Sequence, residues 1–331
     1  MIPKLNLKKI IIVFFIFSIL LLLSNSIVSY LFPEVSNQTK KPITKKEIEL
    51  KFFQSLKSFA IKDEWIDSVM KKSRFVKFKV NVPYDLPISQ ILGDITRSLA
   101  DYKTEINAKE TKINGKTSMQ ISQKKEPVLL ADFVYNSDIQ RTENKSALFI
   151  YGRNAKEAEY DSLFRNIPND YSALLTPSKS ASLYTRWLND NGFNYAVILD
   201  DEITELEYKI DENYSQKRLI LIVKNLVSSF PRALFFVFDK NSAIFTSYTY
   251  SILKREFEKL KIKFCTSDSL KFIIDEDLNA SAEFVKFVKN IKPGSINKIV
   301  VSIDSFLALT EDIRKLIRIG YKFVKPEAIK I

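Results

Sequence analysis

Histidine is absent from the 331 residues of this chain. Ser-His-Asp and Cys-His nucleophile activation, proton transfer through an imidazole and histidine-ligated zinc sites all need that side chain. The sequence therefore excludes these classes of active site.

Cysteine and glycine are also scarce. Cys265 is the single cysteine, so neither an intramolecular disulfide nor a cysteine metal cluster can form. It lies in a predicted strand, where a lone cysteine is usually a small core residue. Only six glycines are present and no glycine-rich phosphate loop is found, so we expect no nucleotide ligand.

Positive charge is in excess but is not concentrated. The formal net charge is +12, yet lysines are spread along the whole chain with acids between them. A nucleic-acid-binding protein gathers its basic residues on one stripe. We therefore expect no nucleic-acid partner and only mild attraction to anionic lipid or envelope polymer.

Residues 10–32 form a long apolar segment without any charged side chain. About 20 apolar residues suffice to cross a bilayer, whereas a cleaved signal has an apolar run of about 7–15. The apolar character resumes at Ile27 after a short polar break, which favours an uncleaved transmembrane anchor with the membrane as partner.

The charges that flank this segment predict its orientation. Lys4, Lys8 and Lys9 favour a cytoplasmic N-terminus, residues 1–9. The other flank is also positively charged, through Lys40, Lys41, Lys45 and Lys46. We predict a single-pass protein of the cell (inner) membrane whose soluble part is periplasmic or extracellular.

Residues 33–145 are predicted to form linkers, a helix and a small module. Residues 33–73 are predicted to be a linker and a juxtamembrane helix, because Thr44 and Glu47 fit a capping box before an apolar helical face. That face more often packs on its own domain than on a partner. Alternating strands, one amphipathic helix and an Asn114-Gly115 turn indicate a small α+β module over 74–135, followed by a linker over 136–145.

From residue 146 to 331 apolar strands alternate with helical stretches. This rhythm predicts an α/β fold with a mostly parallel sheet covered by helices. We expect a distorted (β/α) barrel-like domain of about seven parallel strands, with an open doubly wound sheet as the alternative. The expected strands are 147–150, 171–175, 195–199, 233–238, 262–265, 298–303 and 321–324.

Acidic residues follow several of these strands, at the sheet edge where βα loops gather. One hypothesis is a ring of carboxylates, Asp200, Asp201, Asp239 and Asp304, that holds a hard cation such as Mg²⁺ or Ca²⁺. The alternative is that they cap the helices that open just after the strands. We favour capping, and expect no metal or other cofactor.

The region 146–331 resembles the divergent polysaccharide deacetylases, a bacterial envelope family with a βα-barrel fold akin to the carbohydrate esterases. The resemblance rests on an order of sequence blocks. These blocks are 147–152, 171–178, 191–193, 195–202, 230–242, 298–304 and 320–324. The resemblance implies the fold and the envelope setting.

The resemblance also shows what is missing. The family's activity depends on paired acids after the first strand and on histidines after later strands, which together bind a divalent metal. The matching positions here are Tyr151, Gly152, Asp239 and Ser305 within 302–305. None keeps that chemistry, so the resemblance argues against the reaction.

Three functions remain open at this point. The leading hypothesis is a deacetylase-like domain without catalytic activity that is anchored to the membrane and binds envelope glycan or an envelope partner. The second is a metal-dependent hydrolase that has re-formed its site from the four aspartates. The third is a scaffold or interaction protein that acts through the small α+β module.

Overall fold

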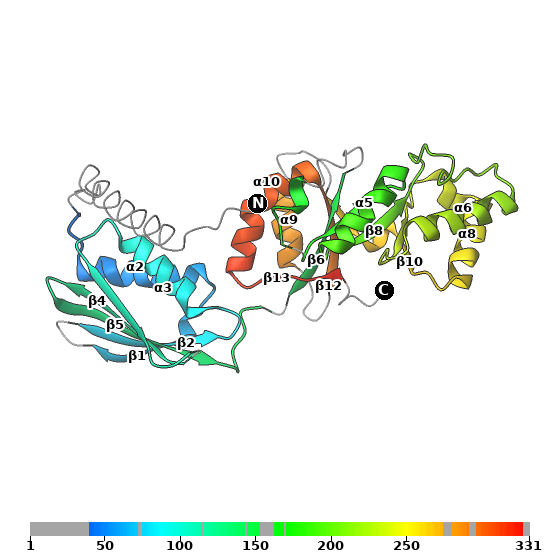
Figure 1. Ribbon diagram of the computed structural model, residues 1–331. Helices are drawn as coiled ribbons and strands as arrows, with labels where there is room; N and C mark the ends of the chain where they lie inside the picture. The colour runs from blue at the N-terminus through cyan, green and yellow to red at the C-terminus, as the bar shows by residue number, and fades with distance from the viewer. Residues whose placement is uncertain are drawn as a thin grey trace, which may run out of the picture. The chain divides into compact units, whose positions relative to one another are not determined.

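A computed structural model of the protein describes residues 40–71, 75–113, 115–142, 144–152, 162–168, 170–273, 280–290 and 296–326. These residues form two compact units (Figure 1). The first, which we call the α+β domain, comprises residues 40–57, Lys62–Val82 and Pro87–Asn136. The second, which we call the βα domain, comprises Ser58–Ile61, Pro83–Leu86 and the residues from Ser137 onward.

The α+β domain is built on a five-stranded sheet with the order β1-β2-β5-β4-β3. The pairs β1–β2, β3–β4 and β4–β5 are antiparallel. Helices α2 and α3 lie on one face of the sheet (Figure 1). The elements are α2 (Lys45–Ser58), η1 (Asp63–Trp65), β1 (Ile66–Lys71), β2 (Val76–Pro83), α3 (Ile88–Leu99), β3 (Glu105–Glu110), β4 (Thr117–Gln123) and β5 (Glu126–Asn136).

The periodicities in the sequence explain most of this domain. Strand β2 alternates buried and less buried residues, as its apolar alternation predicts. Helix α3 buries Ile88, Ile91, Ile95 and Leu99, the apolar face expected from their helical spacing. Glu110 pairs with Thr117 in the β3–β4 hairpin, while Asn114 of the predicted turn lies outside the described residues.

The helix that we expected beside a membrane is part of the α+β domain core. Its capping box is present, because Thr44 N–H donates to Glu47 Oε2 at 2.7 Å and Glu47 N–H donates to Thr44 Oγ1 at 3.3 Å. Phe52 is fully buried and stacks on Phe78 of β2, with ring centroids 5.7 Å apart. Burial of this apolar face explains why the compact unit begins well before the predicted module at residue 74.

The turn between β4 and β5 has an unusual backbone. Gln123 pairs with Glu126, so Lys124 and Lys125 are the two central residues of the hairpin. Their φ angles are 48° and 69°, as a type I′ turn requires. Glycine and asparagine adopt this left-handed region readily, whereas another residue such as lysine loses about 1–2 kcal/mol there. The hairpin is therefore strained.

The βα domain contains a curled parallel half-barrel sheet, which confirms the predicted α/β fold with about seven parallel strands. The order is β10-β9-β8-β7-β6-β12-β11, with β13 pairing with β6. The strands are β6 (Lys145–Tyr151), β7 (Ser172–Leu175), β8 (Asn194–Leu199), β9 (Phe236–Phe238), β10 (Phe264–Thr266), β11 (Lys271–Ile273), β12 (Ile296–Ser302) and β13 (Lys322–Phe323).

The strand order distinguishes a barrel from a doubly wound sheet. Strands β6 to β10 are neighbours in chain order, and β11 and β12 continue that order back to β6. The order never reverses, as it would in a doubly wound sheet. The strands therefore follow one another as in a barrel, with the hydrogen-bonded ladder open between β10 and β11. We did not predict strand β11 from the sequence.

The two faces of this sheet belong to different cores. On one face, Leu148, Val197 and Phe236 pack with apolar residues of the surrounding helices. The helices are α5 (Lys179–Asp190), α6 (Gln216–Ser229), α7 (Ala243–Thr246), α8 (Tyr248–Lys259), α9 (Ala280–Lys289) and α10 (Ile303–Arg318), and the 3₁₀ turn η2 (Ser267–Ser269) links β10 to β11. The other, concave face carries a second cluster that contains strand residues and Leu270.

The predicted membrane localisation is not supported. The proposed anchor, residues 10–32, lies outside the described residues. Within the described part of the chain, no helix combines the length and the apolar character needed to cross a membrane. Helix α10, for example, has 16 residues and is amphipathic, whereas a span needs about 20 apolar ones. We therefore withdraw the single-pass localisation.

Candidate functional site

The predicted acidic residues lie at the carboxyl ends of the parallel strands, and two of them follow β8. Asp200 is 6% exposed, and its Oδ1 accepts a hydrogen bond from the backbone N–H of Glu202 at 3.0 Å. Asp201 Oδ2 accepts from the N–H of Ala243, the first residue of α7, at 2.8 Å. Both carboxylates therefore satisfy backbone donors of turns and helix starts.

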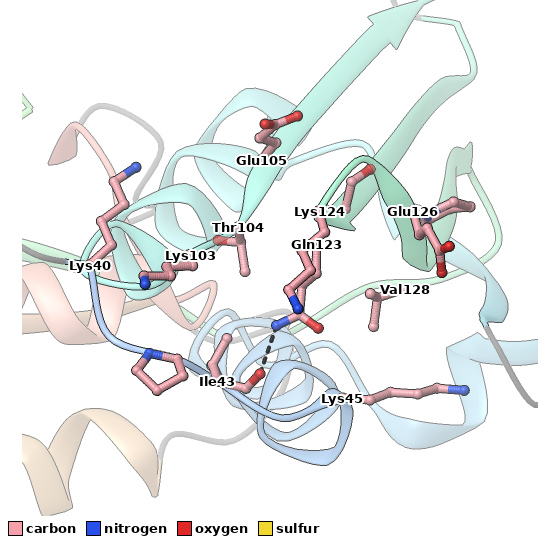
Figure 2. A pocket seen from close by; sticks show the side chains of 13 residues that line it. Lys40, Ile43, Lys45, Lys103, Thr104, Glu105, Gln123, Lys124, Glu126 and Val128 are labelled. Carbon is pink, nitrogen blue, oxygen red and sulfur yellow. Dashed lines mark hydrogen bonds between the residues drawn. The ribbon is translucent and has the colours of Figure 1, made fainter.

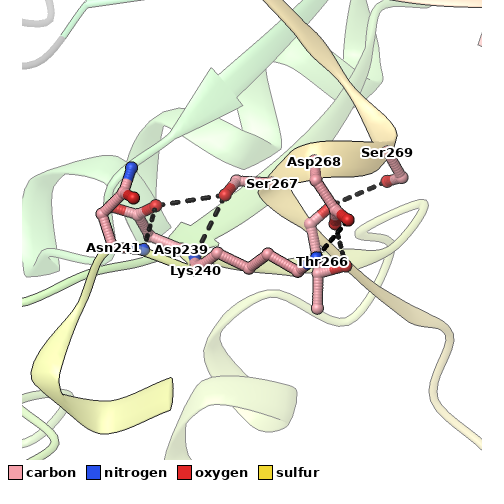
Figure 3. Close-up of polar contacts among 7 residues, drawn as sticks. All are labelled: Asp239, Lys240, Asn241, Thr266, Ser267, Asp268 and Ser269. Carbon is pink, nitrogen blue, oxygen red and sulfur yellow. Dashed lines mark hydrogen bonds and ion pairs between the residues drawn. The ribbon is translucent and has the colours of Figure 1, made fainter. Parts of the chain in front are cut away.

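Asp239, which follows β9, joins a polar network with the turn after β10 (Figure 3). Its Oδ1 accepts from Asn241 N–H and from Ser267 Oγ, each at 3.1 Å. Ser267 Oγ also accepts from Lys240 N–H at 3.0 Å. Lys240 pairs with Asp268, and hydrogen bonds from Lys240 and then Thr266 lower the pKa of the Asp268 carboxyl. The network ties two neighbouring βα turns together.

The last predicted acid and its neighbour belong to the start of α10. Asp304 is exposed in the first turn, where a negative charge is favourable to the helix dipole. Ser302 caps the helix, because its Oγ accepts from Ser305 N–H at 3.0 Å. Ser305 is buried and its hydroxyl lies 2.7 Å from that of Ser302. Asp304 and Ser305 thus belong to the start of α10.

These positions do not form a metal centre in the described part of the chain. No three side chains of histidine, cysteine, aspartate or glutamate there come together as metal ligands would. The acids that follow β8, β9 and β12 instead lie in separate turns. Strand topology brings them to one edge of the sheet, but oxygens of Asp200, Asp201 and Asp239 accept from backbone N–H groups.

The concave face of the sheet, which would form the interior of a barrel, is filled with apolar side chains. Phe149 of β6 is 1% exposed and meets Phe235 edge to face at 5.5 Å. Tyr151, one of the positions that the resemblance matched to a metal ligand, is 2% exposed in the same cluster. Gly152 follows it at the strand end. The described residues of this face therefore form a packed core, as is usual for the interior of a βα barrel.

Cys265 of β10 borders this cluster, as predicted for a small core residue. Burial raises the pKa of its thiol, with a smaller opposing effect of a hydrogen bond with Ser269. A raised pKa disfavours the thiolate, which is the nucleophilic form. Cys265 therefore does not supply a reactive group to this face.

A pocket of about 770 Å³ lies in the α+β domain, for which we predicted no site residues (Figure 2). Three segments that are distant in the sequence supply its lining. They are the stretch before α2, the start of β3 and the β4–β5 hairpin. Its lining residues are Lys40, Pro42, Ile43, Lys45, Lys103, Thr104, Glu105, Ser122, Gln123, Lys124, Glu126, Pro127 and Val128.

Hydrogen bonds hold these three segments together. Gln123 Nε2 donates to the carbonyl of Ile43 at 2.6 Å, joining the hairpin to the stretch before α2 (Figure 2). Lys41 N–H donates to the carbonyl of Asp101 at 2.8 Å, and Lys103 N–H donates to that of Lys41 at 3.0 Å. The cluster Lys40, Lys41, Lys45 in the sequence was the available signal for this site, but we interpreted it as a membrane flank.

Asp132 of β5 is the most strongly perturbed carboxyl group of the same domain. Its side chain is 14% exposed and lies 3.1 Å from Lys77 Nζ and 2.9 Å from Lys116 Nζ. Ser118 Oγ also donates to it at 2.7 Å. Burial acts to raise its pKa, but hydrogen bonds from Ser118, Lys116 and Lys77 together outweigh burial and lower the pKa to about 2.

The Asp132→Asn variant is expected to flatten the acid branch of the stability profile. Because the folded pKa lies below the ordinary value of 3.8, the carboxylate stabilises the fold above about pH 4. That contribution is lost as the pH falls from about 4 towards 2. Urea denaturation should show the variant about 1–2 kcal/mol less stable at pH 7. Equal losses in both proteins between pH 4 and 2 would contradict this assignment.

Comparison with known proteins gives little further information. The chain matches no protein-family model and no curated protein. An uncharacterised protein from Agrobacterium tumefaciens is similar at 12% identity over 56% of this chain and 89% of its own, with a TM-score of 0.40. A family 39 glycoside hydrolase from Bacteroides cellulosilyticus has 9% identity over 47% of this chain and 39% of its own, with a TM-score of 0.28. Likenesses at this level support no conclusion about function.

Proposed function

We propose that this protein is a non-catalytic binding protein whose βα domain has a deacetylase-like fold without the deacetylase reaction, and that it binds a glycan or a protein partner. The observation that carries the proposal lies at the carboxyl ends of the strands, where a βα-barrel enzyme places its active site. Asp200, Asp201 and Asp239 accept hydrogen bonds from backbone N–H groups there. No three acidic side chains of the described residues converge as metal ligands would.

Metal-dependent amide hydrolysis needs parts that the described residues do not assemble. A catalytic metal needs protein ligands, an open position for water and a group that transfers the proton. The sequence has no histidine for these roles, and Asp200, Asp201 and Asp239 accept hydrogen bonds from backbone N–H groups. The alternative of a hydrolase with a re-formed carboxylate site would require these side chains to turn away from their present partners.

A sensitive deacetylase assay tests the proposal. Acetate release from acetylated chitin oligosaccharides should match the rate in buffer alone when Zn²⁺, Mn²⁺, Mg²⁺ or Ca²⁺ is added. The physical reason is the absence of a metal-bound water beside a proton-transfer group. An Asp239→Asn variant is the matched control. Metal-dependent release that EDTA abolishes, and that this variant lacks, would overturn the proposal in favour of the hydrolase.

The scaffold or interaction hypothesis is supported by the pocket of the α+β domain. The pocket lies within one compact unit and is lined by both charged or polar and apolar side chains. Its volume of about 770 Å³ falls in the range of ligand sites, about 300–1,000 Å³. Binding through this domain, with the βα domain as a folded support, is therefore part of the proposed function.

A further inference from the structure

The pocket of the α+β domain has a particular combination of charges. Lys40, Lys45, Lys103 and Lys124 line it together with Glu105 and Glu126. Ammonium groups therefore outnumber carboxylates in the described lining, and they come from all three segments of the pocket. Hydroxyl and amide groups of Thr104, Ser122 and Gln123 add neutral hydrogen-bonding capacity. Such a surface attracts a ligand that carries negative charge and hydroxyl groups.

The lining also argues against other anions. Among the described lining residues there is no aromatic side chain on which a base could stack, and no arginine to clasp a phosphate with two hydrogen bonds. Glu105 and Glu126 would repel a dense polyphosphate. The same carboxylates accept hydrogen bonds from sugar hydroxyls, which polyphosphate does not offer.

The backbone of the β4–β5 hairpin agrees with a binding role for Lys124, although Ala60, Lys125 and Lys261 have positive φ without lining the pocket. Lys124 and Lys125 occupy left-handed φ angles of 48° and 69°, where asparagine and glycine would be relaxed. Strain of this kind concentrates at ligand-binding positions, where the side chain is needed despite its backbone cost. Lys124 is both strained and part of the pocket lining. The hairpin thus carries lysine at a position where stability alone would select another residue.

The frame that carries the lysines is ordered before any ligand arrives. The hydrogen bond from Gln123 to Ile43 fixes the hairpin against the stretch before α2, and the Lys41–Tyr102 bridge fixes that stretch against the start of β3. A site whose backbone is already held loses less entropy on binding. The lysine stems remain adjustable, which suits carboxylates spaced along a chain.

We propose that this pocket binds an acidic polysaccharide segment, with sugar carboxylates held by Lys40, Lys45, Lys103 and Lys124 and sugar hydroxyls held by Glu105 and Glu126. This inference rests on the proposed binding role and names the ligand class for it. The two proposals can fail separately. Acetate release tests whether the βα domain is catalytic, whereas binding of a carboxylated glycan tests the pocket of the α+β domain.

Binding of oligogalacturonate to the full chain, measured by calorimetry, tests the inference. We expect saturable binding that weakens with salt, no binding of neutral maltooligosaccharides and weaker binding of polyphosphate. Lys40→Gln/Lys103→Gln should weaken binding about three- to tenfold, as loss of two exposed charge contacts predicts. The matched control is Lys217→Gln/Lys254→Gln, which removes the same charge at exposed positions of two helices. Its affinity for oligogalacturonate should differ from that of the wild type by less than about twofold.

A hairpin variant separates binding from folding. Lys124→Asn/Lys125→Gly relaxes the type I′ turn, so its thermal midpoint should rise while oligogalacturonate binding weakens. Weaker binding by a more stable protein is not explained by unfolding. The inference is overturned if this variant binds like the wild type. It is overturned equally if the Lys217→Gln/Lys254→Gln control loses as much affinity, or if polyphosphate binds as tightly as the sugar acid.

Discussion

The Phe149→Ala variant is expected to lose about 3–5 kcal/mol of the unfolding free energy of the βα domain. Phe149 is 1% exposed on the concave face and meets Phe235 at 5.5 Å. Its removal would leave a cavity among Ala147, Leu174 and Val300, which the strand backbones prevent from closing. The effect should be largest if the interior is a packed core rather than a binding cleft.

Urea denaturation followed by tryptophan fluorescence measures this loss. Of the two tryptophans, Trp65 lies in the α+β domain and Trp187 in the βα domain. A Trp65→Phe background therefore reports on the βα domain. Leu307→Ala is the matched control, because Leu307 is 58% exposed on α10. A Phe149→Ala loss as small as that of the control would show that the concave face is not a core.

The Phe52→Ala variant is expected to destabilise the α+β domain by a similar amount, about 3–5 kcal/mol. Phe52 is fully buried in α2, stacks on Phe78 at 5.7 Å and lies 6.4 Å from the ring of Phe133. These contacts join the helix to strands β2 and β5. Loss of the ring removes the contacts through which α2 packs on the sheet.

Fluorescence of Trp65 in a Trp187→Phe background reports on this domain. Leu50→Ala is the control on the same helix, because Leu50 is 57% exposed. We expect the control to change stability by less than about 0.5 kcal/mol. Similar small effects of both substitutions would mean that α2 does not contribute to the core of the α+β domain.

The sequence predicted the parallel sheet well because its strands are nearly continuous apolar runs. Residues 147–150 and 195–199, for example, became β6 and β8. Strand β11 was missed because its three residues are too few to show a period. We also did not predict that helix α2 belongs to the α+β domain. An apolar helical face does not reveal which sheet will cover it.

The site was harder to predict than the fold. Strand order places Asp200, Asp239 and Asp304 at one edge, but sequence does not reveal which backbone N–H groups their oxygens accept. The basic pocket joins residues near 40, 103 and 124, and only folding brings these segments together. The strained turn was missed because Lys124-Lys125 lacks the Asn-Gly signature of a type I′ hairpin.

Calorimetric titration of divalent metals into the chelator-treated full chain tests the central claim most directly. The claim is that the βα domain has a packed interior without a hydrolytic metal site. We predict no saturable binding of Zn²⁺, Mn²⁺, Mg²⁺ or Ca²⁺ with a dissociation constant below about 1 mM. Binding of one equivalent that Asp239→Asn abolishes, accompanied by acetate release from an acetylated glycan, would contradict the claim.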